Sequence, residues 1–410
     1  MQAGNGRGGL RVGVVGGSVA GCGTAAVLTG LGYHVTIFER SAGELHDRGA
    51  GIGMHVPLVE DLKARGLVDR SLVGVVPSSR LWCVKDGGAE DGRIIGSEPM
   101  SVETHHWGLL YRQLLARLGT AEYRSGASVA RIVPDRDHVA VVLAGGSEHR
   151  FDIVVGADGY RSVTHPVLER EATLRYCGYP AWRGIVEESA IGDVGLAADA
   201  INAVGTDRGH AVFYLVPGGD GDISPGRRRL NWAWFDGRAP ERLVDPFGLD
   251  AVPRHAAGLN ESQRTYLMAA VRAQMPAWHA RVVERTPAPY VQPIFEREAR
   301  RYSSGRVCLV GDAGSVARPH TGSGTAKAIQ DACVLGEVLE GSESPEEALS
   351  QYDGIRREPG NALVRLGREM GESQVTSCPG WNELDANGFR SWAEKSPVRR
   401  AYYVAVGAAS

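Results

Sequence analysis

The chain has 410 residues, which is more than one hydrophobic core usually serves, so we expect two or three cores. It is 43% apolar, with 45 basic residues against 48 acidic ones, which excludes a disordered chain and a polybasic protein that binds nucleic acid. The six cysteines lie far apart, without a C-x-x-C pair or a cysteine and histidine cluster, so we expect neither a disulfide scaffold nor a metal site.

Residues 12 to 38 contain no Asp, Glu, Lys or Arg, and a stretch of about 20 such residues can span a bilayer. Seven glycines break this stretch into short pieces at turn positions, so we expect no membrane span. Only Arg7 and Arg11 precede it, and no clear cleavage site follows, so we do not expect a secretory signal. A cytoplasmic location follows by default.

The first part of the chain predicts a strand, a helix and a second strand, at residues 12 to 16, 21 to 31 and 34 to 39. Further along, leucines at helical spacing predict a helix that begins at an N-cap on Thr104 and runs through Leu118. Residues 151 to 159 are typical of a buried strand that ends in a turn.

The middle of the chain has a different character. Residues 176 to 237 contain short aromatic and β-branched runs separated by loops, which predicts an antiparallel sheet. A strand ending in a turn is expected at 305 to 314, and helices are expected at 261 to 275 and 324 to 339. Residues 344 to 347 (SPEE) are typical of a helix start, and the C-terminal region is expected to be mostly helical.

A glycine-rich turn joins the first expected strand to the helix, where a dinucleotide-binding fingerprint belongs: Gly16, Gly17, Ser18, Val19, Ala20 and Gly21. Gly16 permits a tight turn, Gly21 lets the helix approach the strand, and Ser18 stands where this pattern normally has glycine. The helix N-terminus would offer unpaired N–H groups to a pyrophosphate. A tight turn without a ligand is the alternative interpretation.

Three acidic residues follow expected strands. Glu39 can accept hydrogen bonds from ribose hydroxyls, and its charge would repel the 2′-phosphate of NADP. Asp158 and Asp312 lie where ligands of an open α/β sheet bind. The loop at 318 to 324 precedes a helix N-terminus, which stabilises negative charge by about 0.3 to 1 kcal/mol, or up to ~2 kcal/mol when partly buried. This favours a flavin, which can be reduced to an anion, over a nicotinamide.

These segments together resemble the three motifs of FAD-dependent aromatic hydroxylases of the para-hydroxybenzoate hydroxylase type. The motifs are GGSVAG at 16 to 21 with Glu39, DIVVGADGYRS at 152 to 162, and GRVCLVGDAG at 305 to 314 with RPHTGSGTAKA at 318 to 328. Within that family, CGYPAWRG at 177 to 184 and LNWAW at 230 to 234 most resemble the members that hydroxylate a dihydroxypyridine.

The resemblance implies an α/β fold, in which a Rossmann-like FAD-binding domain is interleaved with an antiparallel β-sheet substrate domain and followed by C-terminal helices. The FAD-binding domain would be discontinuous, comprising residues 1–72, 104–175 and 290–343. The substrate domain would comprise residues 73–103 and 176–289, and the C-terminal helical region residues 344–410.

The resemblance also implies which residues bind FAD. Asp312 would hold the ribitol, and Asp158 would support the loop between the FAD and the NADH or NADPH approach. Arg112 would reach the pyrophosphate and Arg48 would lie beside the flavin, although a solvated arginine is the alternative for both. The remaining expected cofactor residues are those of the glycine-rich turn, Glu39, Arg40, Pro319, Gly322, Ser323, Gly324 and Thr325.

The implied function is a monooxygenase in which NADH or NADPH reduces FAD, O2 forms a flavin C4a-hydroperoxide, and a small aromatic or N-heteroaromatic ring is hydroxylated. The sequence holds no second dinucleotide fingerprint, so the nicotinamide is expected to bind only transiently. We expect a monomer or a homodimer that binds neither nucleic acid nor a metal.

Candidates for a base that deprotonates the ring are His55, Tyr214 and His320, each of which has ordinary packing as its alternative. Trp182 and Trp234 are candidate walls of the substrate site, and Arg183 is a candidate partner for an anionic substrate. His105 and His106 are interpreted as a helix start, not as a metal pair.

Three other functions are alternatives to this one. A flavin halogenase is disfavoured because Phe235 and Asp236 follow the W-x-W element where that class has Ile-Pro. The same flavin chemistry could carry out epoxidation or oxidative rearrangement of an indole or polyketide-like natural-product intermediate. A flavin-binding protein without turnover is the third alternative.

Overall fold

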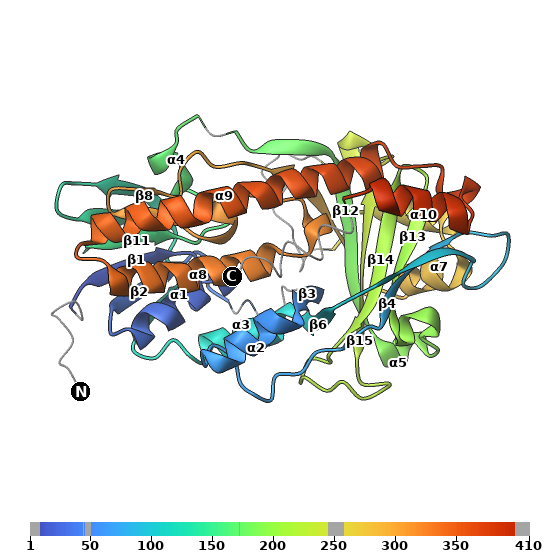
Figure 1. The fold of residues 1–410 in the computed structure, drawn as a ribbon, viewed down its shortest axis with the longest axis horizontal. Coiled ribbons are helices and arrows are strands. Elements are labelled where there is room, and N and C mark those ends of the chain that lie inside the picture. Colours follow the sequence, from blue (N-terminus) through green and yellow to red (C-terminus); the bar gives the residue numbers. More distant parts are fainter. Residues whose placement is uncertain (1–8, 44, 46–50, 172, 245–257, 398–410) are drawn as a thin grey trace.

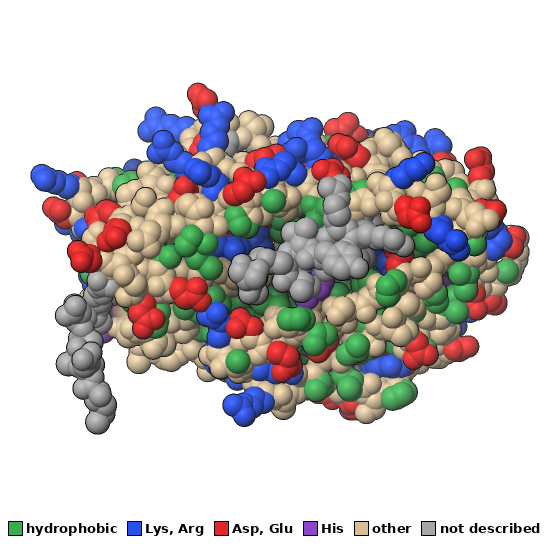
Figure 2. Space-filling view, in the orientation of Figure 1, with side chains coloured by type: hydrophobic (Ala, Val, Ile, Leu, Met, Phe, Trp, Pro, Cys, Tyr) green, Lys and Arg blue, Asp and Glu red, His purple; other side chains and the backbone are tan. Residues whose placement is uncertain are grey.

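The computed structural model describes residues 9–43, 45, 51–171, 173–244 and 258–397. Two large β-sheets lie at opposite ends of the molecule, and long helices run beside the first of them (Figure 1). Among the described residues, no helix combines the length and apolar character needed to cross a bilayer. Acidic and basic side chains are interspersed over the face in Figure 2, without a broad patch of one sign.

The first sheet has six strands in the order β17-β18-β11-β1-β2-β7, and all neighbours are parallel except β17 and β18. Its central strands are apolar and buried on both faces, as expected for a parallel sheet. The strands are β17 (Ser303–Ser304), β18 (Val307–Leu309), β11 (Ile153–Gly156), β1 (Arg11–Val15), β2 (His34–Glu39) and β7 (Glu122–Ser125).

Helices cover one face of this sheet and a small antiparallel sheet covers the other. Helices α1 (Val19–Gly30) and α8 (Gly324–Gly341) pack closely where α8 has Gly336. A Cβ at this position would lie only 2.5 Å from the Val27 side chain, so a larger residue would force the helices apart. The small sheet packs on the opposite face through an apolar cluster that includes Phe38 and Phe151. Its strands are β8 (Val129–Pro134), β9 (Val139–Leu143) and β10 (Glu148–Phe151).

The second large sheet has seven strands in the order β16-β12-β15-β14-β13-β4-β5. Helices α6 (Glu261–Gln274) and α7 (Ala277–Glu284) pack against one face of it through a buried core. The strands are β4 (Ser79–Val84), β5 (Arg93–Pro99), β12 (Arg175–Glu187), β13 (Ala200–Thr206), β14 (Gly209–Val216), β15 (Arg229–Asp236) and β16 (Tyr290–Glu296).

A two-stranded ribbon joins the two sheets. Strand β3 (Gly51–His55) pairs with β6 (Val102–His106), and helices α2 (Val56–Ala64) and α3 (Trp107–Leu115) follow them directly. The ribbon is fixed to the second large sheet because the Gly51 N–H donates to Asn231 Oδ1 at 2.7 Å.

The C-terminal helices extend along both sheets. Helix α9 (Pro345–Gly371) runs beside α8, and α10 (Ala386–Lys395) lies against β5 (Figure 1). The ring of Trp381 stacks on Trp82 with centroids 4.8 Å apart, in an aromatic cluster that includes Phe389 and Trp392. A Cβ on Gly96 of β5 would lie 1.9 Å from Phe389 of α10, so β5 needs a glycine at the position where α10 packs on it.

The α/β fold class is confirmed, and most expected elements occur within one or two residues of their predicted positions. The helix predicted to begin at Thr104 is wrong at its start. Thr104 belongs to β6, where its hydroxyl donates to the Leu215 carbonyl, and the helix begins at Trp107. The antiparallel sheet expected at 176 to 237 is confirmed, since β12, β15, β14 and β13 pair antiparallel, and the sheet is extended by β4, which pairs with β13 in parallel.

We expect Trp381→Ala to destabilise the fold by about 3 to 5 kcal/mol, the usual cost of emptying a large buried aromatic site. The measurement is the free energy of unfolding in urea. Val76→Ala is the control, since Val76 is 64% exposed and its loss should cost under about 0.5 kcal/mol. Equal unfolding midpoints for the two variants would contradict this packing role.

Candidate active site

One cavity of about 670 Å³ runs along the carboxyl ends of the first sheet and reaches the second large sheet. The first turns of α1 and α8 and the ends of β1, β2 and β11 line it on one side. Arg183, Tyr214, Tyr290 and Gln292, from three strands of the second sheet, line the other. Ligands of open α/β sheets bind at this edge.

The glycine-rich turn allows α1 to begin at the cavity. Gly16 has a φ of 101°, and a Cβ on Gly21 would lie 1.8 Å from the Gly16 carbonyl oxygen. Ser18 is the N-cap, but its side chain makes no capping hydrogen bond, and the first turn holds no acidic residue. The first N–H groups of this helix therefore remain available to an anionic ligand.

Glu39 lies at the end of β2 beside this turn and is 7% exposed. One carboxylate oxygen accepts from the Gly17 N–H at 2.9 Å, and the other accepts from the Ser41 N–H at 2.8 Å. A carboxylate offers about four lone-pair sites, so each oxygen can also accept a ribose hydroxyl. The carboxylate is thus fixed in place before a ligand binds.

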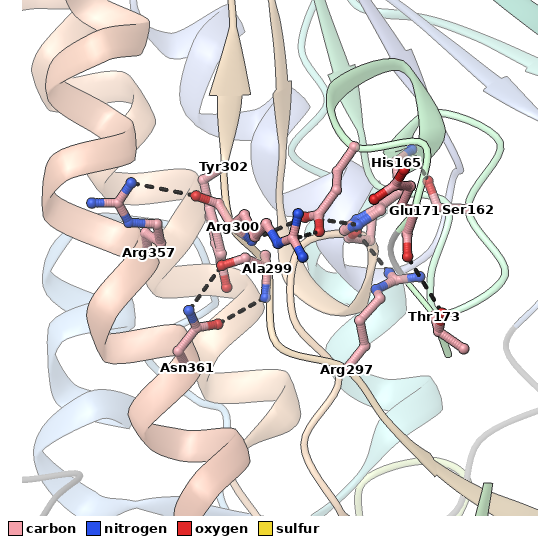
Figure 3. A network of polar contacts seen from close by, with 12 residues as sticks. Ser162, His165, Glu171, Thr173, Arg297, Ala299, Arg300, Tyr302, Arg357 and Asn361 are labelled. Carbon is pink, nitrogen blue, oxygen red and sulfur yellow. Dashed lines mark hydrogen bonds and ion pairs between the residues drawn. The ribbon is translucent and has the colours of Figure 1, made fainter. Parts of the chain in front are cut away.

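Asp158 organises the loop that follows β11. Its carboxylate accepts from the Ser162 hydroxyl at 2.6 Å and from the Val163 N–H at 2.8 Å. Burial raises its pKa, and these hydrogen bonds oppose the rise. The same loop carries His165, whose Nδ1 lies 2.7 Å from the Ala313 carbonyl oxygen (Figure 3).

Arg297 ties this loop to the second acidic motif. Its guanidinium donates to the Tyr160 carbonyl at 3.2 Å, and also to the carbonyls of Asp312 and Ala313 at 3.1 and 2.9 Å. The turns that carry Asp158 and Asp312 are therefore held together by one buried cation.

Asp312 is exposed to the cavity, and α8 begins close to it. Gly322, with a φ of 64°, makes the turn that precedes this helix. The N-cap Ser323 makes no side-chain capping bond, and the first turn holds no acidic residue. A second helix N-terminus with free N–H groups thus lies at the same cavity.

These features fit FAD. Two uncapped helix N-termini suit the pyrophosphate and the flavin ring, and the carboxylates of Glu39 and Asp312 suit sugar and ribitol hydroxyls. Of the cofactor residues predicted from the sequence, those that line the cavity are Gly16, Ser18, Val19, Ala20, Glu39, Arg40, Asp158, Asp312, Pro319, Gly322, Ser323, Gly324 and Thr325. Gly17 and Gly21 lie behind this lining, in the turn itself.

Two predicted cofactor residues are not placed at the cavity. Arg112 is not among its lining residues, and its guanidinium donates to the Gly219 carbonyl at 2.6 Å. Arg48 lies outside the described residues. Their roles toward FAD stay predictions.

Tyr214 lines the cavity, and its hydroxyl donates to the Gly51 carbonyl at 2.8 Å. Burial raises the pKa of this phenol to about 12, although the charge of Arg183 opposes the rise. In this geometry the hydroxyl is a protonated donor that holds β3 against the second sheet. Its role as a base stays a prediction.

The two histidine candidates lie behind the cavity and do not line it. Nε2 of His320 is 2.8 Å from the Tyr179 hydroxyl, and burial lowers the pKa of the imidazole to about 3. His55 is 8% exposed at the start of α2, and burial lowers its pKa as well. Both are therefore neutral at physiological pH.

Trp182 and Trp234 are fully buried and are not cavity walls. Their indole N–H groups donate to Asp236 at 3.1 Å and to the Thr206 hydroxyl at 3.0 Å. They therefore support the sheet from within its core.

Tyr290 and Gln292, which line the cavity from β16, were not predicted from the sequence. Arg183 lies opposite Tyr290 in the sheet and donates to Gln292 Oε1 at 3.0 Å. One sequence signal could have indicated them. Gln292 is a polar residue two positions after Tyr290 in an otherwise apolar strand, and this spacing places both side chains on the same face of the sheet.

Known proteins are similar to this chain over most of its length. Residues 277–366 match the family described as FAD binding domain, and residues 176–296 match the family described as FAD binding domain-like. A curated relative, 2,6-dihydroxypyridine 3-monooxygenase from Paenarthrobacter nicotinovorans, is 28% identical over 88% of this chain and 90% of its own. Aurachin C monooxygenase/isomerase from Stigmatella aurantiaca is also 28% identical, over 95% of this chain and 94% of its own.

The fold is similar to that of 2,6-dihydroxypyridine-3-hydroxylase from Arthrobacter nicotinovorans, with a TM-score of 0.77 at 26% identity. The match covers 92% of this chain and 96% of that chain. Together with the cavity and its three motifs, these matches define a FAD-dependent monooxygenase. More particularly, the chain is similar over most of its length to flavoprotein aromatic hydroxylases of the para-hydroxybenzoate hydroxylase type, the resemblance that its motifs carry.

We expect Gly21→Ala to weaken FAD binding by about tenfold or more, since the added Cβ would push α1 away from the glycine-rich turn. FAD fluorescence quenching on the apoprotein measures the dissociation constant. Gly30→Ala in the same helix is the matched control, because its Cβ would meet no atom within 4 Å. An unchanged constant in Gly21→Ala would exclude the close approach as a requirement for FAD.

Proposed function

We propose that this monooxygenase hydroxylates a small aromatic or N-heteroaromatic ring that carries an ionised oxygen, such as a hydroxypyridine or a hydroxylated aromatic acid. The observation that carries the proposal is the Arg183 guanidinium at the cavity end formed by the second sheet. The relative and the solved structure that hydroxylate a dihydroxypyridine support ring hydroxylation over oxidative rearrangement.

Arg183 has the geometry of an anion-binding residue. Among the described residues no carboxylate lies within ion-pair distance of it, and its Nε has no hydrogen-bond partner there. One terminal nitrogen of the Arg183 guanidinium donates to Gln292. This hydrogen bond orients the guanidinium plane toward the cavity. Burial raises the pKa of Tyr214 and of Tyr290, and the charge of Arg183 opposes the rise in both. An ionised ring oxygen would neutralise this cation.

FAD, when bound, supplies electron transfer from NADH or NADPH and the activation of O2. The chain itself would bind and orient the ring between Arg183 and the start of α8. Tyr214 and Tyr290 would stack on the ring, and the apolar wall of Pro293 and Ile294 would exclude water. An ionised hydroxyl makes the ring electron-rich, which favours attack by an electrophilic oxygen.

The purified protein should be yellow and show the visible absorbance of bound flavin. Phenols, hydroxypyridines, hydroxylated aromatic acids and indoles should then be screened for stimulation of NADH and NADPH oxidation. We expect the stimulating compounds to be anionic rings and the products to carry one added hydroxyl by mass spectrometry. Stimulation by neutral indoles alone, or a rearranged product, would reject the proposal.

We expect Arg183→Met to raise KM for an anionic ring by about ten- to a hundredfold, because a charge-assisted hydrogen bond contributes about 1.5 to 3 kcal/mol. The KM of a neutral ring analogue should change little. Arg238→Met is the control, since Arg238 is exposed and pairs only with Asp207 in the described part of the chain. Equal losses for charged and neutral rings would contradict the role of Arg183.

A further inference from the structure

Lysine is rare in this chain. Only four of its 45 basic residues are lysines, and one of these, Lys327, is buried in the first turns of α8 at 4% exposure. Burying an ammonium group is costly unless it is paired and hydrogen-bonded. The position of Lys327 therefore needs an explanation.

Lys327 and Asp331 bind the backbone carbonyl and the backbone N–H of Gly311. The ammonium donates to the Gly311 carbonyl at 2.7 Å and to Asp331 at 3.1 Å. The same Asp331 oxygen accepts the Gly311 N–H at 2.9 Å. Because this lysine and this aspartate are four residues apart on one helix, α8 clamps the backbone directly before Asp312.

Gly311 is also the point where three elements meet. It has a φ of 60°, and a Cβ there would lie 3.3 Å from Ala20 of α1 and 3.2 Å from Ala328 of α8. Any shift of this residue would move Asp312 relative to both helix N-termini. The clamp therefore sets where the Asp312 carboxylate lies in the cavity.

The charges in this cluster do not balance. Asp331 is fully buried and also accepts from Arg356 Nε at 2.7 Å, so two cations share one carboxylate. Burial lowers the pKa of Lys327, but Asp331, Tyr302 and Asp312 more than offset this and keep it charged. Asp312 is the other carboxylate that faces Lys327, and it opens to the cavity.

We propose that Lys327 is a positioning residue for FAD, which clamps the turn before Asp312 and so places the Asp312 carboxylate where it meets the ribitol. The inference rests on the proposed contact between Asp312 and FAD. Lys327 touches neither substrate nor cofactor in this role.

The pH dependence of FAD binding follows from the groups that face Asp312. These are Lys327 and Asp331 from α8, Arg297 after β16, and Tyr160 from the loop after β11. Burial raises the pKa of Asp312, the two cations lower it, and Asp331 raises it. FAD affinity should fall as pH drops through this pKa, because the protonated acid is a poorer acceptor for the ribitol hydroxyl.

The test measures the FAD dissociation constant of the apoprotein by fluorescence quenching from pH 5 to 9. Lys327→Met should weaken binding by about tenfold or more at pH 7 and move the midpoint of the pH profile upward by about half a unit or more. Asp331→Asn should move the midpoint downward, since it removes an anion that faces Asp312. Lys327→Arg keeps the charge and should keep the wild-type midpoint, and exposed Lys395→Met is the control.

Several results would overturn the proposal. These are wild-type affinity in Lys327→Met, a uniform loss at every pH with an unchanged midpoint, or a shift in the same direction for Lys327→Met and Asp331→Asn. If Lys327→Met fails to fold, the Asp331→Asn and Lys327→Arg midpoints decide the question.

Asp312→Asn separates this inference from the proposed FAD contact. If Asp312→Asn loses affinity and pH dependence while Lys327→Met binds FAD like the wild type, the role of Lys327 alone is wrong. If Asp312→Asn keeps the wild-type affinity and profile, the contact between Asp312 and FAD is wrong, and the inference falls with it.

Discussion

The N-termini of α1 and α8 both face one cavity. They can do so because neighbouring chain segments approach each other there at distances that only glycine permits. Gly21 lies against the Gly16 carbonyl, and Gly311 lies between an alanine of α1 and an alanine of α8. Neither helix has a side-chain cap or an acidic residue in its first turn. Their free N–H groups and dipoles therefore act together on whatever fills the cavity, and this favours a ligand with a pyrophosphate and an electron-accepting ring.

Basic side chains around this cavity have different roles. Arg297 and Lys327 hold the turn of Asp312 from two sides through backbone carbonyls, whereas Nε of Arg183, at the far end, has no hydrogen-bond partner among the described residues. A buried charge that binds backbone carbonyls fixes a geometry, because any movement would leave it unsatisfied. A partly buried cation such as Arg183, without an acidic partner among the described residues, instead favours an anionic ligand. In the proposed function, basic side chains thus position the cofactor at one end of the cavity and select the substrate at the other.

The parts of the fold that the sequence predicted well depend on local rules. The strand, glycine-rich turn and helix at the N-terminus follow from apolar runs and from the steric needs of a tight turn, and the Ser344 cap accepts the Glu347 N–H as its pattern predicts. The helix start at Thr104 failed because this segment pairs with β3 and bonds to Leu215, more than a hundred residues away. Such long-range pairing overrides a local capping preference.

The sequence by itself determined the class of the protein, because the three FAD motifs combine turn geometry with strand and helix periodicity over short spans. It did not determine which aromatic and basic side chains face the substrate. Neighbouring residues on a strand point to opposite faces, so Trp182 is buried in the sheet while Arg183 reaches the cavity. Only the tertiary structure decided which face was which, because the position of the cavity depends on the packing of β3, β16 and α8 from distant parts of the chain.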